Sequence, residues 1–316
     1  MRIVVTGAAG FIGSHLAERL HRDGHDVSGI DCLTDYYDVR LKRRNAADLA
    51  AAGIPLLKLD LAEDDLRDAL GDAEIVYHLA AQPGISTTTG FAAYLRNNIV
   101  ATQRIIDAVR SSPRLQCVVY GSTSSVYGAH ATDTEDTAPR PTSAYGVTKL
   151  AGEQLALAAW RDQRMPCCSL RLFSVYGPRE RPEKLYPKLI RAIHEDSEFP
   201  LYEGSEQHLR SYTYVADAVD GLVAVLDRLP KVIGEIINIG CDTQITTGEG
   251  IAIVERIMGR QARIRRVPRR AGDQLNTLAN ISKARRLLNY APRTLPEEGL
   301  RAEVEWFKTN VLGMES

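Results

Sequence analysis

Residues 2–13, RIVVTGAAGFIG, join a run of β-branched residues to three glycines at positions 7, 10 and 13. The apolar run predicts a β-strand, and the residues after Gly10 predict a helix. In such a strand-to-helix turn, Gly7 allows the tight bend, Gly10 lets a pyrophosphate approach the backbone, and Gly13 permits close helix packing. The positive end of the helix attracts phosphate. The stretch therefore predicts a dinucleotide-binding unit.

Short apolar runs alternate with helical patterns through the first half of the chain. Helices are expected from about residue 12 and over residues 63–70, 92–111, 144–163 and 216–229, with strand-like runs such as IVYHLAA and QCVVYGS between them. Strands that alternate with helices predict βαβ units and a parallel sheet with helices on both faces. The sequence thus predicts a Rossmann-like, doubly wound α/β fold.

The alternation breaks after residue 177, in the proline- and charge-rich stretch PRERPEKLYP. A chain of 316 residues also exceeds the usual size of a single hydrophobic core. We expect a cofactor-binding domain of residues 1–173 plus 212–240. A smaller, mixed α/β substrate-binding domain is expected from residues 174–211 plus 241–316.

The composition argues against several classes of partner. Hydrophobic residues make up 44% and charged residues 25% of the chain, and the formal net charge is -1, which gives no field for nucleic acid or an acidic membrane. The five cysteines and seven histidines show no metal-ligand spacing, and no run of 18 apolar residues occurs. We expect a cytoplasmic protein with no metal and no nucleic-acid or membrane partner.

A carboxylate closes the second expected strand. Asp31 lies eighteen residues after Gly13, where it can accept hydrogen bonds from the adenosine ribose of a dinucleotide and would repel the 2′-phosphate of NADP. The expected cofactor is therefore NAD. Asp60 and Leu61, at the end of the third expected strand, leave two interpretations open, which are contacts to adenine or a helix N-cap.

Tyr145 and Lys149, in YGVTK, are four residues apart and therefore share one face of the helix expected over residues 144–163. An ammonium group there lowers the pKa of the phenol, which can then act as a base near neutral pH. Alone, this spacing is more often a solvated pair on a helix surface. The glycine motif and the hydroxyl-rich STSSVYG at residues 122–128 favour a catalytic pair.

Together these motifs resemble the extended short-chain dehydrogenase/reductase family, and within it the NAD-dependent nucleotide-sugar epimerases, over nearly the whole chain. The matching segments are GAAGFIG (7–13), HLAAQ (78–82), Asn98, STSSVYG, YGVTK, RLFSVYGPRERP (171–182), RSYTYVADA (210–218) and RRAGD (269–273). The resemblance implies a catalytic trio of Thr123, Tyr145 and Lys149. Besides the residues above, it implies NAD contacts from Phe11, Ile12, Leu79, Ala80 and Ala81.

The row of hydroxyls separates two reactions of that family. Its nucleotide-sugar 4,6-dehydratases have Thr-Asp-Glu where this chain has Thr123, Ser124 and Ser125, and elimination of water needs those carboxyl groups. The resemblance therefore implies a 4-epimerase. Tyr145 would take the C4 hydroxyl proton while hydride passes to NAD, and the 4-keto sugar would turn and receive the hydride on its other face. Thr123 would bond the reacting oxygen, and Ser122 the strand end and neighbouring backbone.

The segment TDYYDVRLK, residues 34–42, resembles a stretch typical of UDP-glucuronate 4-epimerases and is expected to flank the cofactor. For a uronate, Ser124, Ser125 and Ser174 would hold the C6 carboxylate together with Arg181. The alternative for Arg179 and Arg181 is a solvated loop that pairs with Glu180 and Glu183. The resemblance further implies diphosphate contacts from Arg210 and Arg270, a ribose contact from Asp273 and a uracil contact near Tyr202.

Two departures from the family pattern are Ser86, where many glucuronate epimerases have arginine, and Ser211, where the family has aspartate. The first leaves the sugar open, because it removes a charge near the substrate side of the nicotinamide pocket. Conversion of UDP-glucuronate to UDP-galacturonate is the leading interpretation. The alternatives are UDP-glucose/UDP-galactose 4-epimerase, another nucleotide-sugar reductase or epimerase, and a non-catalytic NAD-sensing protein. The resemblance also implies a homodimer through the helices at 92–111 and 144–163.

Three further features receive structural interpretations. His78 is expected to pack beside the dinucleotide, and Asn98 to fix the strand that carries Thr123. The run RIRRVPRR, residues 263–270, could be mistaken for a nucleic-acid patch. Its alternation with Ile264 and Val267 instead predicts a strand edge with outward arginines.

Overall fold

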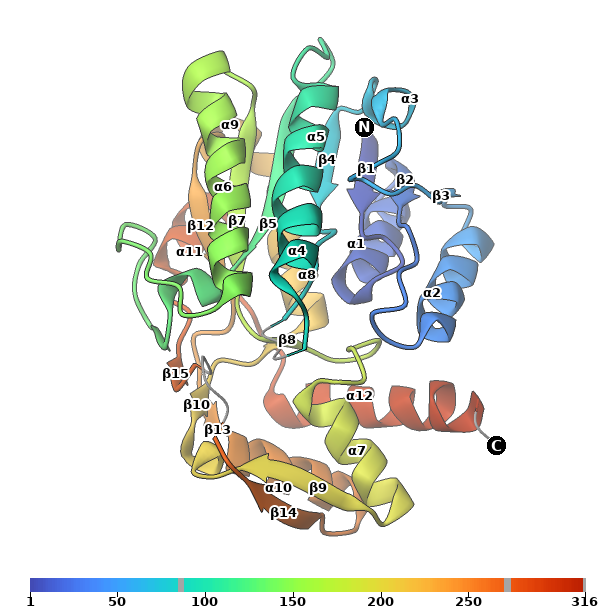
Figure 1. Cartoon of the computed structure of the whole chain (residues 1–316), viewed down its shortest axis with the longest axis vertical. Coiled ribbons are helices and arrows are strands. Elements are labelled where there is room, and N and C mark those ends of the chain that lie inside the picture. The colour runs from blue at the N-terminus through green and yellow to red at the C-terminus, as the bar shows by residue number, and fades with distance from the viewer. Residues whose placement is uncertain (85–87, 270–273, 315–316) are drawn as a thin grey trace.

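A seven-stranded parallel sheet forms the centre of the larger lobe in the computed structural model, which describes residues 1–84, 88–269 and 274–314 (Figure 1). The strands run in the order β12-β7-β5-β4-β1-β2-β3, and every neighbouring pair is parallel. They are β1 Arg2–Thr6, β2 Asp26–Ile30, β3 Leu56–Leu57, β4 Ile75–His78, β5 Cys117–Thr123, β7 Cys167–Leu172 and β12 Ile236–Ile239. The predicted Rossmann-like, doubly wound fold is confirmed.

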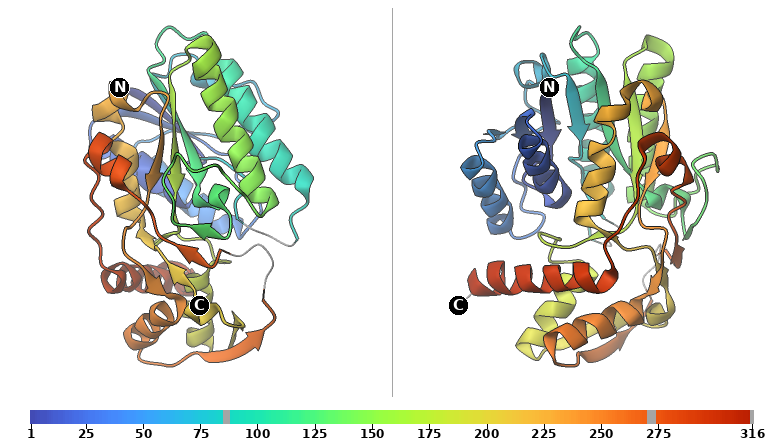
Figure 2. Two further views of the ribbon diagram at one scale, coloured as in Figure 1. Left: turned by 90° about the vertical axis from the view of Figure 1, so that its left-hand side faces the viewer. Right: turned by 180° about the vertical axis from the view of Figure 1, so that it is seen from behind.

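Helices cover both faces of this sheet (Figures 1 and 2). Alternate strand residues enter opposite cores, since Ile3 and Val5 belong to one buried cluster and Val4 to another. The first cluster takes residues from α1 Phe11–Arg22, α2 Val39–Ala51, α8 Val215–Val223 and α11 Ser282–Leu288. The second takes residues from α3 Arg67–Leu70, α5 Ala101–Val109 and α6 Ala144–Gln163.

Three expected helices have informative boundaries. The helix predicted over 144–163 is confirmed as α6, whereas the one predicted over 92–111 is a run of α4 Phe91–Tyr94, the π-helix η1 Leu95–Val100 and α5. The helix predicted over 63–70 shrinks to α3, because Asp60 and Asp65 accept hydrogen bonds from backbone N–H groups and form separate turns.

The helix predicted over 216–229 was too long. It ends as α8 at Val223 and is followed by η4 Leu226–Arg228 and α9 Leu229–Val232. Pro230 lies in the first turn of α9, where its missing N–H is tolerated, but a proline cannot continue a preceding helix.

A smaller lobe lies below the carboxyl ends of the strands (Figure 1). Its core contains residues of α7 Leu185–Glu195, α10 Thr247–Met258, α12 Pro296–Asn310 and β9 Glu198–Tyr202. Its strands form a sheet of order β13-β10-β15-β6 and the pairs β11-β8 and β14-β9. The remaining elements are β6 His130–Ala131, β8 Val175–Tyr176, β10 Leu209–Arg210, β11 Thr213–Tyr214, β13 Ile245–Thr246, β14 Arg263–Val267, β15 Asn276–Thr277, η2 Ser124–Tyr127, η3 Ser205–Gln207 and η5 Leu312–Met314.

The division of the chain at residues 173, 211 and 240 stays a prediction. Helix α11 falls in the segment 241–316 that the sequence assigns to the smaller domain, yet Ala284 and Leu288 are buried in the core of the large sheet. The C-terminal segment therefore contributes to the core of the large sheet and to the core of the smaller lobe.

The arginine run of β14 is an exposed edge, as expected. The predicted alternation of outward arginines with sheltered apolar side chains is wrong. Ile264 is as exposed as its neighbours, because β14 pairs with β9 in a sheet of only two strands. Arg265 and Arg266 form ion pairs with Glu198 and Glu206. These two pairs hold outward arginines against carboxylates of the same chain.

Candidate active site

The carboxyl ends of β1 and β4 lie side by side where the strand order reverses, because the chain runs from β1 toward β3 at one edge and from β4 toward β12 at the other. Ligands of doubly wound sheets bind at such a switch point. A cavity of about 590 Å³ opens there and extends into the smaller lobe.

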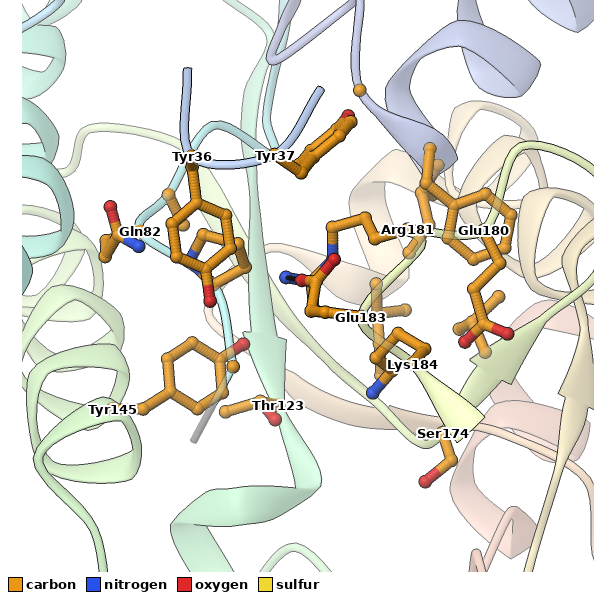
Figure 3. Close-up of a pocket in the computed structure, with 18 of the residues that line it drawn as sticks. Tyr36, Tyr37, Gln82, Thr123, Tyr145, Ser174, Glu180, Arg181, Glu183 and Lys184 are labelled. Atoms are coloured by element: carbon orange, nitrogen blue, oxygen red, sulfur yellow. Dashed lines mark hydrogen bonds and ion pairs between the residues drawn. The ribbon is translucent and has the colours of Figure 1, made fainter. Parts of the chain in front are cut away.

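One cavity brings together every predicted site residue that the structure describes. Figure 3 shows part of its wall, with Tyr145 and Thr123 facing the side chains of residues 180–184 across the space. The predicted residues on the wall are Gly7, Gly10, Phe11, Ile12, Gly13, Asp31, Asp60, Leu61, Leu79, Ala80, Ala81, Thr123, Ser124, Ser125, Tyr145, Lys149, Ser174, Arg181, Tyr202 and Arg210. Arg270 and Asp273, and the departure at Ser86, lie outside the described residues.

The glycine motif forms a tight backbone turn at the start of α1. Gly7 has φ +71, and a Cβ on it would lie 2.9 Å from Ala80 Cα, so the loops after β1 and β4 touch. A Cβ on Gly13 would lie 2.1 Å from the Gly7 carbonyl oxygen. The first turn of α1 carries no acidic side chain. These features leave the helix N-terminus open to an anion and fit the pyrophosphate of NAD.

Asp31 and Asp60 both reach the cavity, and both also hold backbone. The Asp31 carboxylate accepts hydrogen bonds from Ala9 N at 3.1 Å and Leu33 N at 2.8 Å, which ties the glycine loop to the end of β2. Asp60 accepts from Ala62 N at 2.9 Å and pairs with Arg96 at 2.8 Å. Asp60 therefore caps a turn, and its contact to adenine stays a prediction.

Tyr145 is placed by the N-terminus of α6. The helix begins after Ser143, whose hydroxyl accepts a hydrogen bond from Gly146 N at 3.1 Å. A Cβ on Gly146 would lie 2.7 Å from the Ser125 carbonyl oxygen, so the glycine allows α6 to pack tightly on the turn that follows Thr123. This packing brings the phenol to the end of β5, beside Thr123 (Figure 3).

Burial, not Lys149, dominates the electrostatics of the phenol. Burial raises the pKa of Tyr145, while the hydrogen bond with Thr123 and the charge of Arg181 act in the opposite direction. Burial also lowers the pKa of Lys149 to about 7, and its ammonium lies 4.2 Å from the centre of the Tyr120 ring. The expectation that Lys149 lowers the phenol pKa stays a prediction.

The hydroxyl row divides into different environments. Ser124 and Ser125 line the cavity, and Ser125 N donates to Thr123 Oγ1 at 3.2 Å. Ser122 was expected to bond the strand end, but within the described chain its buried hydroxyl has no hydrogen-bond partner. Ser122 lies on β5 opposite Arg171 of β7.

His78 and Asn98 have structural roles, because each side chain bonds other groups of the protein. The His78 ring bonds the hydroxyls of Thr6 at 2.9 Å and Thr102 at 3.0 Å, and burial lowers its pKa to about 3, which fits the expected packing role. Asn98 was expected to fix the strand of Thr123. Its amide instead joins Gln82 N at 2.7 Å and Thr148 Oγ1 at 3.0 Å, so it ties the loop after β4 to α6.

The two arginines of GPRERP have different positions. Arg179 pairs with Glu18 at 2.8 Å and Asp48 at 3.2 Å and anchors the loop on α1 and α2, as a structural residue would. Arg181 lines the cavity, forms an ion pair with Glu183 and lies 5.9 Å from the centre of the Tyr36 ring. Both interpretations of Arg181 therefore hold in part, because it is paired with Glu183 and also faces the cavity.

Several wall residues were not singled out from the sequence, among them Tyr36, Tyr37, Lys42, Gln82, Glu180, Glu183, Lys184, Tyr212 and Gln274. The segment 34–42 was noticed but expected only to flank the cofactor, whereas Tyr36 and Tyr37 line the cavity and the Tyr36 ring points toward Tyr145 (Figure 3). The charges of 180–184 gave no spacing signal, because the course of an irregular loop decides which of them turn inward.

Among the residues that the structure describes, no group of three or more His, Cys, Asp or Glu side chains is placed to hold a metal ion. Over the same residues, no helix is long and apolar enough to cross a membrane.

Comparisons with known proteins agree with this geometry. The NAD dependent epimerase/dehydratase family matches residues 3–240. The chain is 39% identical over 314 residues to the uncharacterized UDP-glucose epimerase YtcB of Bacillus subtilis, with 98% of each chain covered. It is 32% identical over 327 residues to UDP-glucuronate 4-epimerase 2 of Arabidopsis thaliana, covering 96% of this chain and 75% of that protein.

A solved structure is similar over almost the whole fold. The UDP-glucuronic acid 4-epimerase of Bacillus cereus, in complex with UDP-glucuronic acid and NAD, superposes with a TM-score of 0.94 at 38% identity, covering 98% of this chain and 99% of that one. The switch-point cavity, the glycine turn and the Thr123 and Tyr145 pair are thus found in a chain that belongs to the NAD-dependent epimerase/dehydratase family.

Proposed function

We propose that this chain is an NAD-dependent UDP-sugar 4-epimerase and that its preferred reaction interconverts UDP-glucuronate and UDP-galacturonate. The observation that carries this proposal is the single cavity in which Tyr145 and Thr123 meet the glycine turn on one side and Arg181, Ser124 and Ser125 on the other. A base, a cofactor cradle and donors for an anionic sugar then share one space. The named activities of the Bacillus cereus and Arabidopsis thaliana proteins support the same assignment.

Tyr145 and Thr123 have different roles at the C4 oxygen of the sugar. Tyr145 takes the proton of the C4 hydroxyl and later returns it, and Thr123 donates a hydrogen bond to the same oxygen. NAD, when bound, supplies the hydride acceptor and donor together with the positive charge of its oxidised ring. Lys149, one helical turn from Tyr145, is placed to hold the cofactor ribose and the phenol.

Elimination of water is disfavoured because the positions of the expected acid and base lack carboxyl groups. Positions 124 and 125 carry serine, and the wall acids nearby are engaged elsewhere. Glu183 pairs with Arg181, and Glu180 is 5% exposed and interacts with Glu303 of α12. Neither arrangement offers the acid and base that a 4,6-dehydratase needs.

The nucleotide and sugar contacts of this proposal are those that the resemblance to the family implies. Arg210 and Arg270 are proposed for the diphosphate, Asp273 for the ribose and Tyr202 for uracil. Ser124, Ser125, Ser174 and Arg181 are proposed for the C6 carboxylate. A neutral UDP-hexose is the second candidate, because Arg181 already pairs with Glu183 and the Bacillus subtilis relative is named for UDP-glucose.

Purified protein should convert UDP-glucuronate to its C4 epimer without added NAD, because each catalytic cycle regenerates the cofactor. The measurement is NMR of the sugar protons after incubation with UDP-glucuronate, UDP-glucose or UDP-N-acetylglucosamine in parallel. Turnover of UDP-glucose alone would replace the uronate assignment by the hexose one. Bound NAD with no turnover of any sugar would favour an NAD-sensing protein.

We also propose a homodimer through the face formed by α4, η1 and α6. Large apolar side chains are exposed there in the single chain, since Phe91 is 55%, Leu95 42% and Val147 47% exposed. An apolar group of this size on neighbouring helices is typical of a protein interface. The five cysteines are free thiols, which fits our proposal of a reducing, cytoplasmic location.

Replacing Leu95 by aspartate should convert this dimer to a monomer, because a carboxylate buried in an apolar interface without a partner is strongly unfavourable. Light scattering coupled to size-exclusion chromatography measures the mass. Leu295→Asp is the matched control, since Leu295 is 69% exposed before α12, away from this face. A wild-type protein that elutes as a monomer at micromolar concentration would contradict the proposal.

A further inference from the structure

We propose that Tyr36 is a cofactor-retaining residue, which together with Arg181 closes the cavity and slows the release of bound NAD. Both side chains line the cavity. The inference concerns the cofactor and not the choice of sugar, and it rests on the proposed function only for its purpose. Because the hydride taken from C4 must return to the same sugar, a 4-epimerase has to keep its cofactor while the keto sugar turns.

Tyr36 lies in an irregular segment, residues 31–38, which joins β2 to α2. The segment begins at Asp31, the carboxylate that we expect at the adenosine ribose of NAD. Farther along the segment, the Tyr36 ring points toward Tyr145, the residue that we expect at the reacting end of the cofactor (Figure 3). The segment therefore extends along the cavity wall between the residues expected at the two ends of the dinucleotide.

The segment is held in both lobes. Its first carboxylate is tied to the glycine turn by the hydrogen bond from Ala9 N at 3.1 Å. The Lys42 ammonium donates to the carbonyl and hydroxyl oxygens of Thr34 at 2.9 and 2.7 Å, and it lies 4.9 Å from the centre of the Tyr37 ring. Tyr37 packs against the core of the smaller lobe. Tyr36 is thus placed by a backbone that is fixed on both sides of it.

Three loops approach one another at Tyr36. The Arg181 guanidinium lies 5.9 Å from the centre of the Tyr36 ring. A Cβ on Gly84 would lie 3.5 Å from Arg181 Nη2 and 3.9 Å from Tyr36 Oη. The Gly84 carbonyl accepts a hydrogen bond from Tyr94 Oη at 2.8 Å, and the Tyr94 ring packs on Tyr145. The loops after β2, β4 and β8 therefore meet close to the phenol of Tyr145.

The contact between Tyr36 and Arg181 is formed by protein groups alone. The ring and the guanidinium attract each other by a cation–π interaction, and the ion pair with Glu183 helps to hold the guanidinium in place. A dinucleotide that leaves past the ring must break this contact and expose the apolar surface that the ring covers. Burial of an aromatic side chain contributes enough free energy to slow release at least about tenfold.

The test measures release of NAD in the absence of any sugar. Protein equilibrated with radiolabelled NAD is mixed with excess unlabelled NAD and filtered at intervals, which gives the dissociation rate. Tyr36→Ala should raise this rate at least about tenfold, whereas Tyr36→Phe should change it less than about twofold because the ring remains. Trp306→Ala is the control, since it removes a half-buried ring of α12 that does not line the cavity.

Tyr36 belongs to none of the three hydrophobic clusters that the described residues form, so Tyr36→Ala should keep the circular dichroism spectrum of the wild type. A Tyr36→Ala rate within about twofold of the wild-type rate would overturn the inference, and so would equal acceleration by Trp306→Ala. Turnover of UDP-sugars by the wild type tests the proposed function separately. Unchanged release in an active enzyme rejects only the inference, whereas faster release from Tyr36→Ala with no wild-type turnover rejects only the proposed function.

Discussion

Tyr145→Phe should lower kcat for C4 epimerisation by about 10²–10⁴-fold, because it removes the hydroxyl that exchanges a proton with the reacting oxygen. The ring itself should stay in place, since it packs 6.4 Å from the Tyr94 ring and is fixed by the first turn of α6. NAD binding should change by less than about twofold, because a phenylalanine ring keeps the packing of the site. NMR of the sugar measures the rate, and NAD released on denaturation measures the cofactor content.

A matched loss of a buried hydroxyl separates the catalytic effect from a structural one. Tyr290 is 3% exposed, and among the described residues its hydroxyl has no hydrogen-bond partner. It is buried in the core of the large sheet and does not line the cavity. Tyr290→Phe should therefore leave kcat unchanged. Near-normal activity of Tyr145→Phe would show that another group moves the proton.

The protonation state of Tyr145 follows from the groups around its phenol. Burial raises the pKa of Tyr145, and burial also lowers the pKa of Lys149 to about 7. The chain alone therefore keeps the phenol protonated at neutral pH. The positive ring of oxidised NAD provides charge that favours the phenolate when the cofactor is bound. Base catalysis by this phenol thus depends on the loaded protein.

The sequence predicts the regular parts of this molecule well. Gly7 has a positive φ that few other residues adopt, and Gly13 leaves no room for a Cβ beside the Gly7 carbonyl oxygen, so both the turn and its ligand class follow from the sequence. The helix over 144–163 follows from its capping serine and its length, and it carries Tyr145 and Lys149 on one face. Local signals of this kind do not depend on the rest of the fold.

Irregular segments were harder to predict, because their inward residues are chosen by tertiary packing. Nothing in PRERPEK distinguishes Arg179, which anchors the loop on α1 and α2, from Arg181, which faces the cavity. The same holds for Tyr36, in a segment expected to flank the cofactor. Asn98 was correctly given a structural role but an incorrect partner, since only the fold shows that η1 faces α6.

The sequence also gave no sign of a buried ion pair that joins the catalytic helix to the sheet. Glu153, on α6, and Arg171, on β7, have side chains 0% and 1% exposed. The guanidinium donates to both carboxylate oxygens, at 2.7 and 3.0 Å, and to Tyr127 Oη at 2.8 Å. Ser169 donates to the same carboxylate at 3.0 Å. Both carboxylate oxygens and all three guanidinium nitrogens are thus hydrogen-bonded inside the protein.

Glu153→Gln should reduce the free energy of unfolding by about 3–5 kcal/mol, because it leaves the Arg171 charge buried without a counter-charge. The amide also presents a donor where the guanidinium and Ser169 both donate. Urea denaturation followed by circular dichroism measures the change. Asp72→Asn is the control, since the Arg2 and Asp72 side chains are 40% and 43% exposed, and an exposed pair contributes less than about 1 kcal/mol.

A double variant distinguishes a lost attraction from an unpaired charge. Glu153→Leu with Arg171→Met removes both charges and keeps apolar volume in the same space, so it should be more stable than Glu153→Gln alone. If the double variant is instead less stable than Glu153→Gln, the hydrogen bonds to Tyr127 and Ser169 contribute more than the burial of charge costs. If Glu153→Gln costs no more than Asp72→Asn, the ion pair does not stabilise the junction of α6 and β7. The result bears on catalysis too, because the same helix fixes Tyr145 two turns earlier and Glu153 helps Lys149 keep its proton.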